Sequence, residues 1–192
     1  MASFEDHNEE GIRLFRCGQP EEAAAQFEAA LVLSPKSPVS WFNKGNCLWA
    51  LGRPAEALVC YEEALGFDEG FAQAWSMKGL CLAIVGQPRD GLSSLDKAVA
   101  LSPKTAAFWA SRGHVLNLLG LYAEALVSLE RALKLDPLLA DAWNHKGGAL
   151  EGLGRRPEAL VAFNKALSLN PDHLKASANE GRLLDLLRQE NK

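Results

Sequence analysis

The stretch that decides the fold is residues 41–64, WFNKGNCLWALGRPAEALVCYEEA. Its first tryptophan returns every 34 residues, at Trp41, Trp75, Trp109 and Trp143, and a glycine follows each one four positions later. No insertion or deletion interrupts this period. A fixed period of about 20 to 50 residues is typical of solenoids, in which each unit buries its apolar face by stacking on its neighbours. The sequence therefore predicts a tandem array.

Within this stretch the pattern is helix, turn, helix. The first helix is predicted over residues 39–51, with Trp41 and Gly45 on one stripe at helical spacing. Gly52 can end this helix in the left-handed conformation. Pro54 can open the next helix, because the first position of a helix does not need its N–H.

The second helix carries a small–large–small stripe of Ala57, Tyr61 and Ala64, which lets two helices approach closely. Glycine also recurs at the eighth place of every unit, beginning with Gly11. Glycine costs about 1 kcal/mol relative to alanine inside a helix, so its regular use predicts close helix crossings. One unit differs in its second helix, because Gly91 stands where the other four have alanine.

The unit resembles the tetratricopeptide repeat (TPR), whose pattern Trp–x2–Leu–Gly–x2–Tyr … Ala–x3–Phe … Pro it matches at nearly every place. The resemblance covers residues 4 to about 190. It implies an all-α, right-handed α-solenoid whose first helices line a concave groove. One difference recurs before the glycine, where the family usually has leucine and this chain has Lys44, Lys78, Arg112 and Lys146. We expect the stems of these side chains to pack while their charges reach water.

We expect a single domain over residues 4–190, because a repeat array has no natural cut point. The predicted repeats are 4–37, 38–71, 72–105, 106–139 and 140–173, followed by a capping helix at 174–190. This last helix has no second helix to cover its leucines, which are Leu183, Leu184, Leu186 and Leu187. Homodimerisation through this end is therefore one prediction for the chain.

Composition restricts the classes of partner. The chain has 192 residues, 48% of them hydrophobic, and a net charge of −4 with no basic cluster, so nucleic acid is not an expected partner. The sequence lacks a long apolar run and begins with an acidic segment, which predicts a soluble, intracellular, cytoplasmic protein without membrane association. Residues 1–30 hold seven acidic side chains and two arginines. This segment is either a solvated polar cap or a docking patch for a basic partner.

The residue types that carry chemistry are scattered. Cys17, Cys47, Cys60 and Cys81 show no metal-binding spacing and are predicted to be small, reduced core residues. The four histidines lie in different units, and His114 and His145 are interpreted as hydrogen-bonding contacts of the groove. The sequence predicts no catalytic residue, no cofactor and no metal site.

Helical geometry indicates which side chains the groove presents to a partner. The predicted groove residues are Phe42, Asn43, Asn46, Trp49, Gln73, Met77, Leu80, Ile84, Ser111, His114, Asn117, Asn144 and His145. Large apolar side chains on a helix face that nothing covers mark a binding surface. Asparagine can clamp a peptide backbone, because its amide offers a donor and an acceptor. The alternative is that curvature buries Trp49, Leu80 and Ile84 between adjacent first helices.

Two further features bear on the ligand. Gly148 and Gly152 remove side chains from the groove side of the fifth unit, either to admit a ligand or as a tolerated weakness of the helix. TPR co-chaperones that hold acidic tails use a clamp of Lys, Asn and Arg on three successive units. The corresponding places here hold Phe42, Gln73, Met77 and Ala107, so the ligand is not expected to be strongly acidic.

The sequence therefore predicts a non-catalytic protein–protein interaction module or scaffold, which binds a peptide or partner helix in its groove. Two alternatives are open. One is a chaperone-like holder of an apolar client segment, and the other is a structural scaffold that associates with copies of itself. Fold alone does not choose among them.

Overall fold

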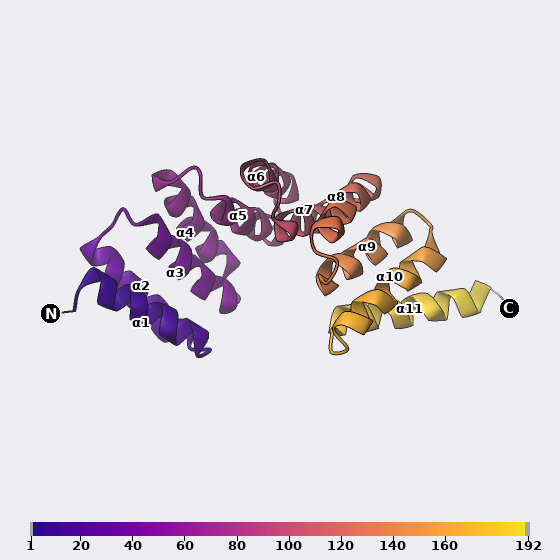
Figure 1. The fold of residues 1–192 in the computed structure, drawn as a ribbon, viewed down its shortest axis with the longest axis horizontal. Helices are drawn as coiled ribbons and strands as arrows, with labels where there is room; N and C mark the ends of the chain where they lie inside the picture. Colours follow the sequence, from indigo (N-terminus) through magenta and orange to yellow (C-terminus); the bar gives the residue numbers. More distant parts are fainter. Residues whose placement is uncertain (1, 191–192) are drawn as a thin grey trace. The chain divides into compact units, whose positions relative to one another are not determined.

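The computed structural model describes residues 2–190, and all regular secondary structure in this range is α-helical (Figure 1). The helices form two compact units, one that ends at Leu101 and one that begins at Ser102. The first unit contains α1 (Phe4–Arg16), α2 (Pro20–Leu33), α3 (Pro38–Ala50), α4 (Pro54–Phe67), α5 (Ala72–Ile84) and α6 (Pro88–Leu101). The second contains α7 (Ala106–Leu118), α8 (Tyr122–Leu135), α9 (Ala140–Gly152), α10 (Arg156–Leu169) and α11 (Leu174–Glu190).

Within each unit the chain is a series of helix pairs. In the first unit α1 packs on α2, α3 on α4 and α5 on α6, and each second helix also contacts the next first helix. In the second unit α7 packs on α8 and α9 on α10, and α11 covers α10. The predicted all-α fold of tandem helix pairs is confirmed. The boundary between the units falls after α6, four residues before the end of the third predicted repeat, and it stays a prediction that all five repeats act as one domain.

The predicted turn chemistry is also confirmed. Gly52 follows the C-cap residue Leu51 with a φ of 69°, in the left-handed region that favours glycine. The Arg53 N–H donates to the Leu48 carbonyl oxygen at 2.9 Å, which satisfies one of the last carbonyls of α3. Pro54 then begins α4. The observed helix α3 differs from the predicted range by one residue at each end.

The glycines at the eighth place are required by close packing, as predicted. A Cβ atom on Gly45 would lie 2.7 Å from the ring of Tyr61. In the third repeat the two helix backbones themselves approach, since a Cβ on Gly91 would lie 2.6 Å from the carbonyl oxygen of Gly79. The glycine that replaces alanine at position 91 therefore has a steric reason, which is the close approach of α5 and α6.

Each repeating tryptophan ties its helix to the turn before it. The Trp41 indole N–H donates to the Pro35 carbonyl oxygen at 2.9 Å, and the tryptophans at positions 75, 109 and 143 make the equivalent bond six residues back. Because an indole N–H needs a partner when the ring is partly buried, this bond fixes the entry to each first helix. The sequence pattern identified these tryptophans but not this partner.

The stems of the lysines before the glycines are largely buried, as expected, and their charges are paired with exposed glutamates rather than free in water. Lys44 Nζ lies 3.5 Å from the carboxylate of Glu28, on the second helix of the preceding repeat. The pairs of Lys78 with Glu62, at 2.9 Å, and of Lys146 with Glu130, at 3.3 Å, repeat this arrangement. The charge of each of these lysines thus joins two consecutive repeats.

Two further expectations are tested by burial. Cys47, Cys60 and Cys81 are buried free thiols, but Cys17 is exposed at the C-cap of α1, so its assignment to the core is wrong. In α11 Leu183 is fully buried, and Leu187 packs against the cluster around Leu150 and Phe163. Part of the apolar surface of α11 is therefore buried against α9 and α10. Homodimerisation through this helix stays a prediction, which sedimentation at increasing concentration can test.

Candidate functional site

The predicted groove residues are divided between the two units. We define the first-helix face of the first unit as the eight that lie on α3 and α5, namely Phe42, Asn43, Asn46, Trp49, Gln73, Met77, Leu80 and Ile84. The other five lie on α7 and α9 in the second unit, namely Ser111, His114, Asn117, Asn144 and His145. Each set therefore belongs to a different unit.

Part of the first-helix face is used inside the first unit. The ring of Phe42 packs against those of Phe71 and Tyr61, with centroids 4.7 and 5.7 Å away. Asn46 Oδ1 accepts a hydrogen bond of 2.9 Å from the buried Tyr61 hydroxyl. Phe42 and Asn46 thus support the packing of α3 on α4, and Phe42 also packs on the N-cap residue of α5, roles that their position in the sequence did not indicate.

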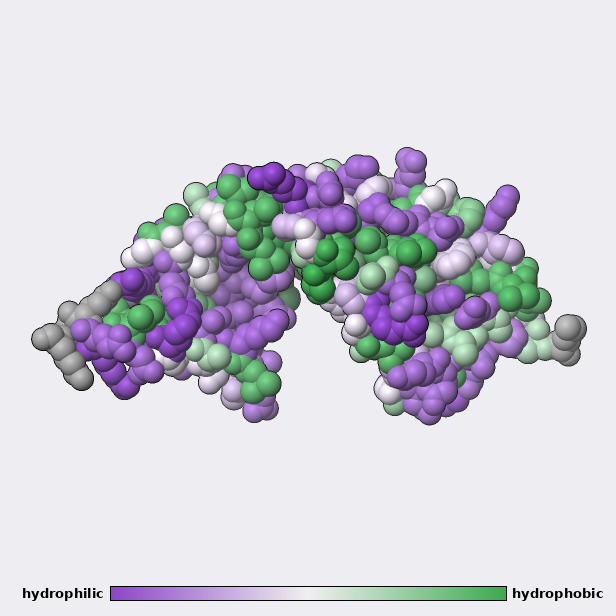
Figure 2. Space-filling view, turned by 180° about the vertical axis from the view of Figure 1, so that it is seen from behind, coloured by the Kyte–Doolittle hydropathy of each residue, from purple (hydrophilic) through white to green (hydrophobic). Residues whose placement is uncertain are grey.

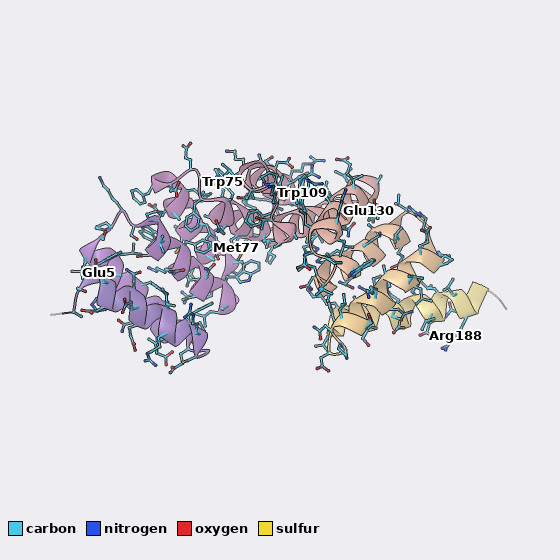
Figure 3. The ribbon with its side chains drawn as sticks, in the orientation of Figure 1. Glu5, Trp75, Met77, Trp109, Glu130 and Arg188 are labelled. Carbon is cyan, nitrogen blue, oxygen red and sulfur yellow. The ribbon has the colours of Figure 1, made fainter. Side chains whose placement is uncertain are left out.

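The rest of the first-helix face is open to solvent to a varying degree. Trp49, Met77 and Leu80 are half-buried, whereas Ile84 is 59% exposed. Burial of Ile84 between first helices, the alternative raised by the sequence, is therefore not observed. Met77 and Trp75 lie on opposite sides of α5, which separates this face from the outer side of the unit (Figure 3).

The second-unit pocket has a volume of about 510 Å³ and is built mainly by the first helices α7 and α9 and by α11. It is lined by His114, Asn117, Leu118, Tyr122, Asn144, His145, Gly148, Glu151, Gly152, Asn179 and Arg182. Four of the five predicted site residues in this unit line it, and Ser111 does not. The structure thus brings together residues from two repeats and the capping helix.

Hydrogen bonds between helices hold the polar wall of the pocket. Asn117 Nδ2 donates to the main-chain oxygen of His145 at 2.8 Å, and Asn179 Nδ2 donates to Asn144 Oδ1 at 3.0 Å. Asn117 Oδ1, in contrast, is the single buried side-chain nitrogen or oxygen within residues 2–190 that lacks a hydrogen-bond partner. Buried polar atoms without partners are rare in native structures, so this acceptor calls for an explanation.

One side of the pocket also carries an ion pair. Arg182 donates from Nη1 to Oε1 of Glu151 at 2.5 Å and from Nη2 to Oε2 at 2.7 Å. Because the two charges compensate each other in a two-pronged pair, they add no net charge to the pocket.

Two histidines stack in this pocket, although they come from different repeats. The rings of His114 and His145 have centroids 4.2 Å apart and are inclined by 25°. Burial, followed by the charge of Lys175, lowers the pKa of His114. Burial, followed by the neighbouring His114, lowers the pKa of His145 to about 3. Both imidazoles are therefore neutral at pH 7, with one donor and one acceptor nitrogen each.

The two groove-side glycines of α9 have different roles. A Cβ on Gly152 would lie 2.6 Å from the ring of Tyr122, so the missing side chain makes room for that ring. A Cβ on Gly148 would meet nothing closer than Asn117 Nδ2, at 3.7 Å, which is an ordinary contact. Packing explains the first glycine. The second leaves open space in the wall of the pocket.

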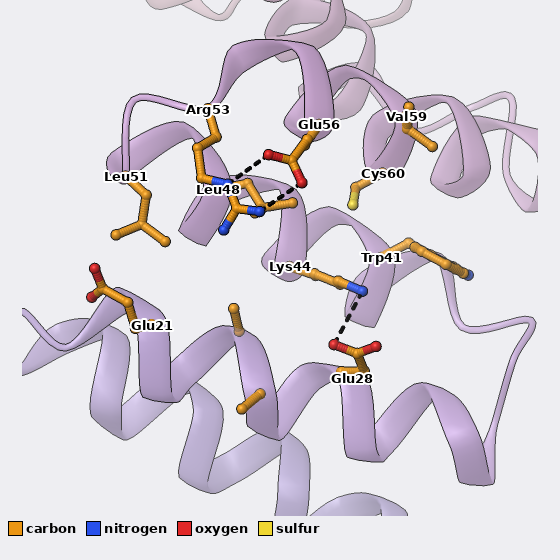
Figure 4. Close-up of a pocket in the computed structure, with 12 residues that line it drawn as sticks. Glu21, Glu28, Trp41, Lys44, Leu48, Leu51, Arg53, Glu56, Val59 and Cys60 are labelled. Carbon is orange, nitrogen blue, oxygen red and sulfur yellow. Dashed lines mark hydrogen bonds and ion pairs between the residues drawn. The ribbon is translucent and has the colours of Figure 1, made fainter.

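A different set of clefts recurs on the outer side of the repeats. In the first unit a cleft of about 570 Å³ is lined by residues that include Trp41, Lys44 and Leu48. The ion pair of Lys44 with Glu28 joins α3 to α2 in this cleft, and the ion pair of Arg53 with Glu56 lies at the start of α4 (Figure 4). Smaller clefts follow at the same places of later repeats, beside Trp75 and beside Trp143. Because they repeat with the period of the fold, these clefts follow from the packing of consecutive helix pairs.

Sequence reasoning missed the contribution of α11 to the second-unit pocket. Asn179 and Arg182 lie 34 residues after His145 and Gly148, at the corresponding places of the repeat. Extending the repeat register into the capping helix would have found both. The stacking of the two histidines depends on how α7 packs on α9, which the spacing of single residues does not give.

Other chemistry is sparse in the described part of the chain. Burial raises the pKa of Cys47 and Cys81 to about 12 and that of Cys60 to about 11, so these thiols stay protonated at pH 7. Within residues 2–190 no three side chains of the metal-binding types gather at a common point. None of the helices described has the length and apolar character needed to cross a membrane. On the face seen in Figure 2, apolar side chains gather in separate patches between hydrophilic ones.

Comparisons with known proteins agree with the repeat pattern. Two family models, both described as tetratricopeptide repeat, match the chain, one at residues 8–70 and 85–137 and the other at 140–173. A search of curated proteins found no match.

Solved structures of similar fold cover most of the chain. YrrB, described as a TPR protein with an unusual peptide-binding site, is 26% identical over 92% of this chain and 91% of its own, with a TM-score of 0.70. A thermophilic TPR protein in Thermus thermophilus is 23% identical over 95% and 99%, with a TM-score of 0.76. MamA from Desulfovibrio magneticus RS-1 is 21% identical over 88% and 96%, with a TM-score of 0.76.

Proposed function

Because the chain belongs to the tetratricopeptide repeat family, we propose that it is a non-catalytic interaction module that binds a peptide or partner helix on the first-helix face of its first unit. TPR proteins generally mediate protein–protein interaction, and the similar protein YrrB is described as having a peptide-binding site. The fold gives only the class of function. The choice of surface rests on the side chains of α3 and α5.

The observation that carries the proposal is the uncovered apolar surface of this face. Ile84 is 59% exposed, and the half-buried Trp49 and Leu80 belong to the same set of first-helix side chains. A solvated helix face normally fills with charged residues, whereas all eight residues of this face are uncharged. Exposed apolar surface of this kind is typical of a site that a partner covers.

Polar groups on the same face can orient the partner. The side chain of Asn43 makes no hydrogen bond to any residue in the described range, and its amide can donate to and accept from one peptide group. Lys44 and Lys78, the cations nearest in sequence, are paired with glutamates of the preceding second helices. The ligand that fits is therefore apolar or uncharged, and large contacts such as Trp49 are the usual hot spots.

Absence of catalysis is part of the proposal. A nucleophile needs a base beside it or a lowered pKa, and the pKa of each buried thiol is raised. The neutral histidine pair lies in a second-unit pocket whose lining includes no serine, threonine or cysteine.

The test compares two substitutions of matched exposure. Ile84→Ser removes an apolar contact from the first-helix face, and Val59→Ser removes one from α4, where Val59 is 55% exposed. Partners captured from a native extract by the wild-type chain should bind the Ile84 variant at least about tenfold more weakly and the Val59 variant unchanged, because a buried contact of this size contributes about 1.5–3 kcal/mol. Equal losses for both variants, or none, would contradict the proposal. Asn43→Ala provides a polar variant of the same face.

A further inference from the structure

We propose that the second-unit pocket binds a primary carboxamide, such as the side chain of a glutamine or asparagine in a peptide ligand. This inference rests on the proposed function in one respect, which is that the carboxamide is carried by a peptide. The pocket itself belongs to the second unit and is independent of the first-helix face of the first unit.

The pocket carries no net charge. The one acidic and the one basic side chain that line it, Glu151 and Arg182, neutralise each other in a two-pronged ion pair. The two imidazoles stack on each other at 4.2 Å, where a positive charge on either would be repelled by a charge on the other. Removing an unpaired charge from water is costly, so a charged side chain would find no compensation here.

Several hydrogen-bonding groups of the pocket remain free. Neither imidazole forms a hydrogen bond to another residue of the described range. Their ring nitrogens are also not among the buried atoms without a partner, so solvent reaches these nitrogens. Each neutral ring offers one donor and one acceptor. Nδ2 of Asn144 is a further donor, since the bond from Asn179 uses only its oxygen.

The wall of the pocket also contains the unpartnered acceptor. Asn117 already donates through Nδ2, and its Oδ1 has no donor. Solvent does not reach this oxygen, so the acceptors that the open pocket offers to a ligand N–H are the acceptor nitrogens of the two imidazoles. Among uncharged side-chain groups, only a primary carboxamide combines two N–H donors with an acceptor oxygen, which matches acceptors and donors on the same wall.

The pocket has room for such a group. Its volume of about 510 Å³ lies in the range of ligand sites, and Gly148 keeps its wall open although an alanine Cβ would fit there without a clash. Because alanine would also favour the helix, glycine at this position gives up helix stability without a packing reason. The glycine at position 148 is explained if the open space beside it receives a ligand.

The experiment titrates the full-length chain, labelled with ¹⁵N, with four capped peptides. The peptides are acetyl-Ala-Ala-Xaa-Ala-Ala N-methylamide with glutamine, glutamate, lysine or leucine at Xaa, and the methylated cap avoids a second primary amide. We expect saturable shifts of the amide signals of α7, α9 and α11 with the glutamine peptide. Binding of the other three should be at least about tenfold weaker, because the free groups of the pocket would stay unpaired. Equal affinity for all four peptides would overturn the inference.

Three variants locate the binding. Gly148→Leu should abolish the shifts, whereas Gly181→Leu, on α11 where an added Cβ meets nothing within 4 Å, should retain them. His114→Phe keeps a stacked ring but loses both nitrogens, and should weaken glutamine binding about tenfold even if the Gly148 variant does not fold. Unchanged binding to a folded His114 or Gly148 variant would place the peptide elsewhere and contradict the pocket.

Propionamide separates this inference from the proposed function. Saturable shifts of the pocket signals with propionamide, combined with no partner captured through the first-helix face, would leave the pocket standing and reject the proposed function. If capture depends on Ile84 but the pocket signals do not shift with propionamide or the glutamine peptide, the proposed function stands and the carboxamide pocket is rejected.

Discussion

At the scale of single residues, the absence of one carbon atom sets how closely two helices cross. Four of the five repeats have alanine at the place that Gly91 occupies in the third. Alanine is the better helix former, and agreement among the repeats also favours it. Alanine does not fit at position 91, because its Cβ would lie 2.6 Å from the carbonyl oxygen of Gly79, a backbone atom that cannot rotate away.

We therefore predict that Gly91→Ala destabilises the chain by about 1–3 kcal/mol, the usual cost of overpacking. Gly181→Ala on α11, with nothing within 4 Å of the added atom, should instead stabilise it by up to about 1 kcal/mol. Urea unfolding followed by circular dichroism measures both changes. A Gly91 variant as stable as the wild type would show that α5 and α6 are not held so closely.

The histidine pair gives a residue-scale prediction about pH. His145 has an ordinary pKa of 6.5 and a folded-state pKa of about 3, lowered by burial first and then by His114, Lys175 and His173, against the opposing effect of Asp141. The unfolded chain therefore takes up a proton at a higher pH than the folded one. The contribution of the neutral His145 side chain to the stability of the folded chain is therefore full above pH 6.5 and is lost progressively as the pH falls toward 3.

Between pH 7 and pH 5 this loss should be on the order of 1–2 kcal/mol. His145→Gln should reduce the loss, because glutamine does not titrate. The comparison is made between wild type and variant at each pH, so that other titrating groups cancel. The same fall in stability in both proteins would contradict the burial of His145.

At the scale of elements, ion pairs join consecutive repeats on their outer side. Lys78 pairs with Glu62 at 2.9 Å, lies over the ring of Trp75 at 5.5 Å, and stands where the family usually has leucine. The lysine stem can therefore replace leucine in packing, while the charge adds a contact between repeats. Exposed pairs contribute little, so the coupling should be below about 1 kcal/mol.

A double-mutant cycle of Lys78→Leu and Glu62→Gln tests this prediction. Lys78→Leu alone should change the free energy of unfolding by less than about 1 kcal/mol, and the coupling should shrink further at high salt. A loss of several kcal/mol on Lys78→Leu would mean that the charge, rather than the stem, holds the repeats together.

The elements themselves could be predicted from the sequence because glycine and proline mark their ends. Gly52 and Pro54 delimit α3 and α4 by backbone geometry alone, and the predicted range of α3 was off by one residue at each end. Side-chain partners could be predicted less well. Asn46 was assigned to a ligand, yet the hydroxyl of Tyr61 uses its oxygen, and such a bond depends on how two helices face each other.

The same limit applies to the candidate site. Helical periodicity placed His114, Asn117, Asn144 and His145 on one side of their helices, and the structure gathers them around one pocket. The stacking of the rings and the unpartnered Asn117 oxygen could not be predicted, because both follow from the packing distance between α7 and α9.

At the scale of the whole molecule, each of the two compact units carries a candidate surface of its own. The first unit offers an uncharged, partly apolar face on α3 and α5, and the second offers a polar pocket between α7, α9 and α11. Stacked repeats usually bind through extended surfaces of this kind rather than through one deep cavity. The proposed function places the partner on first helices rather than on second helices.

Hydrogen exchange of the full-length chain, alone and with the partner it captures, distinguishes the two sets of helices. Bound partner slows exchange where it covers or stabilises the backbone. We predict added protection in α3 and α5, with α7 and α9 joining them if the ligand also carries a carboxamide that reaches the second unit. Protection confined to the second helices α2, α4 and α6, with α3 and α5 unchanged, would contradict the proposed function.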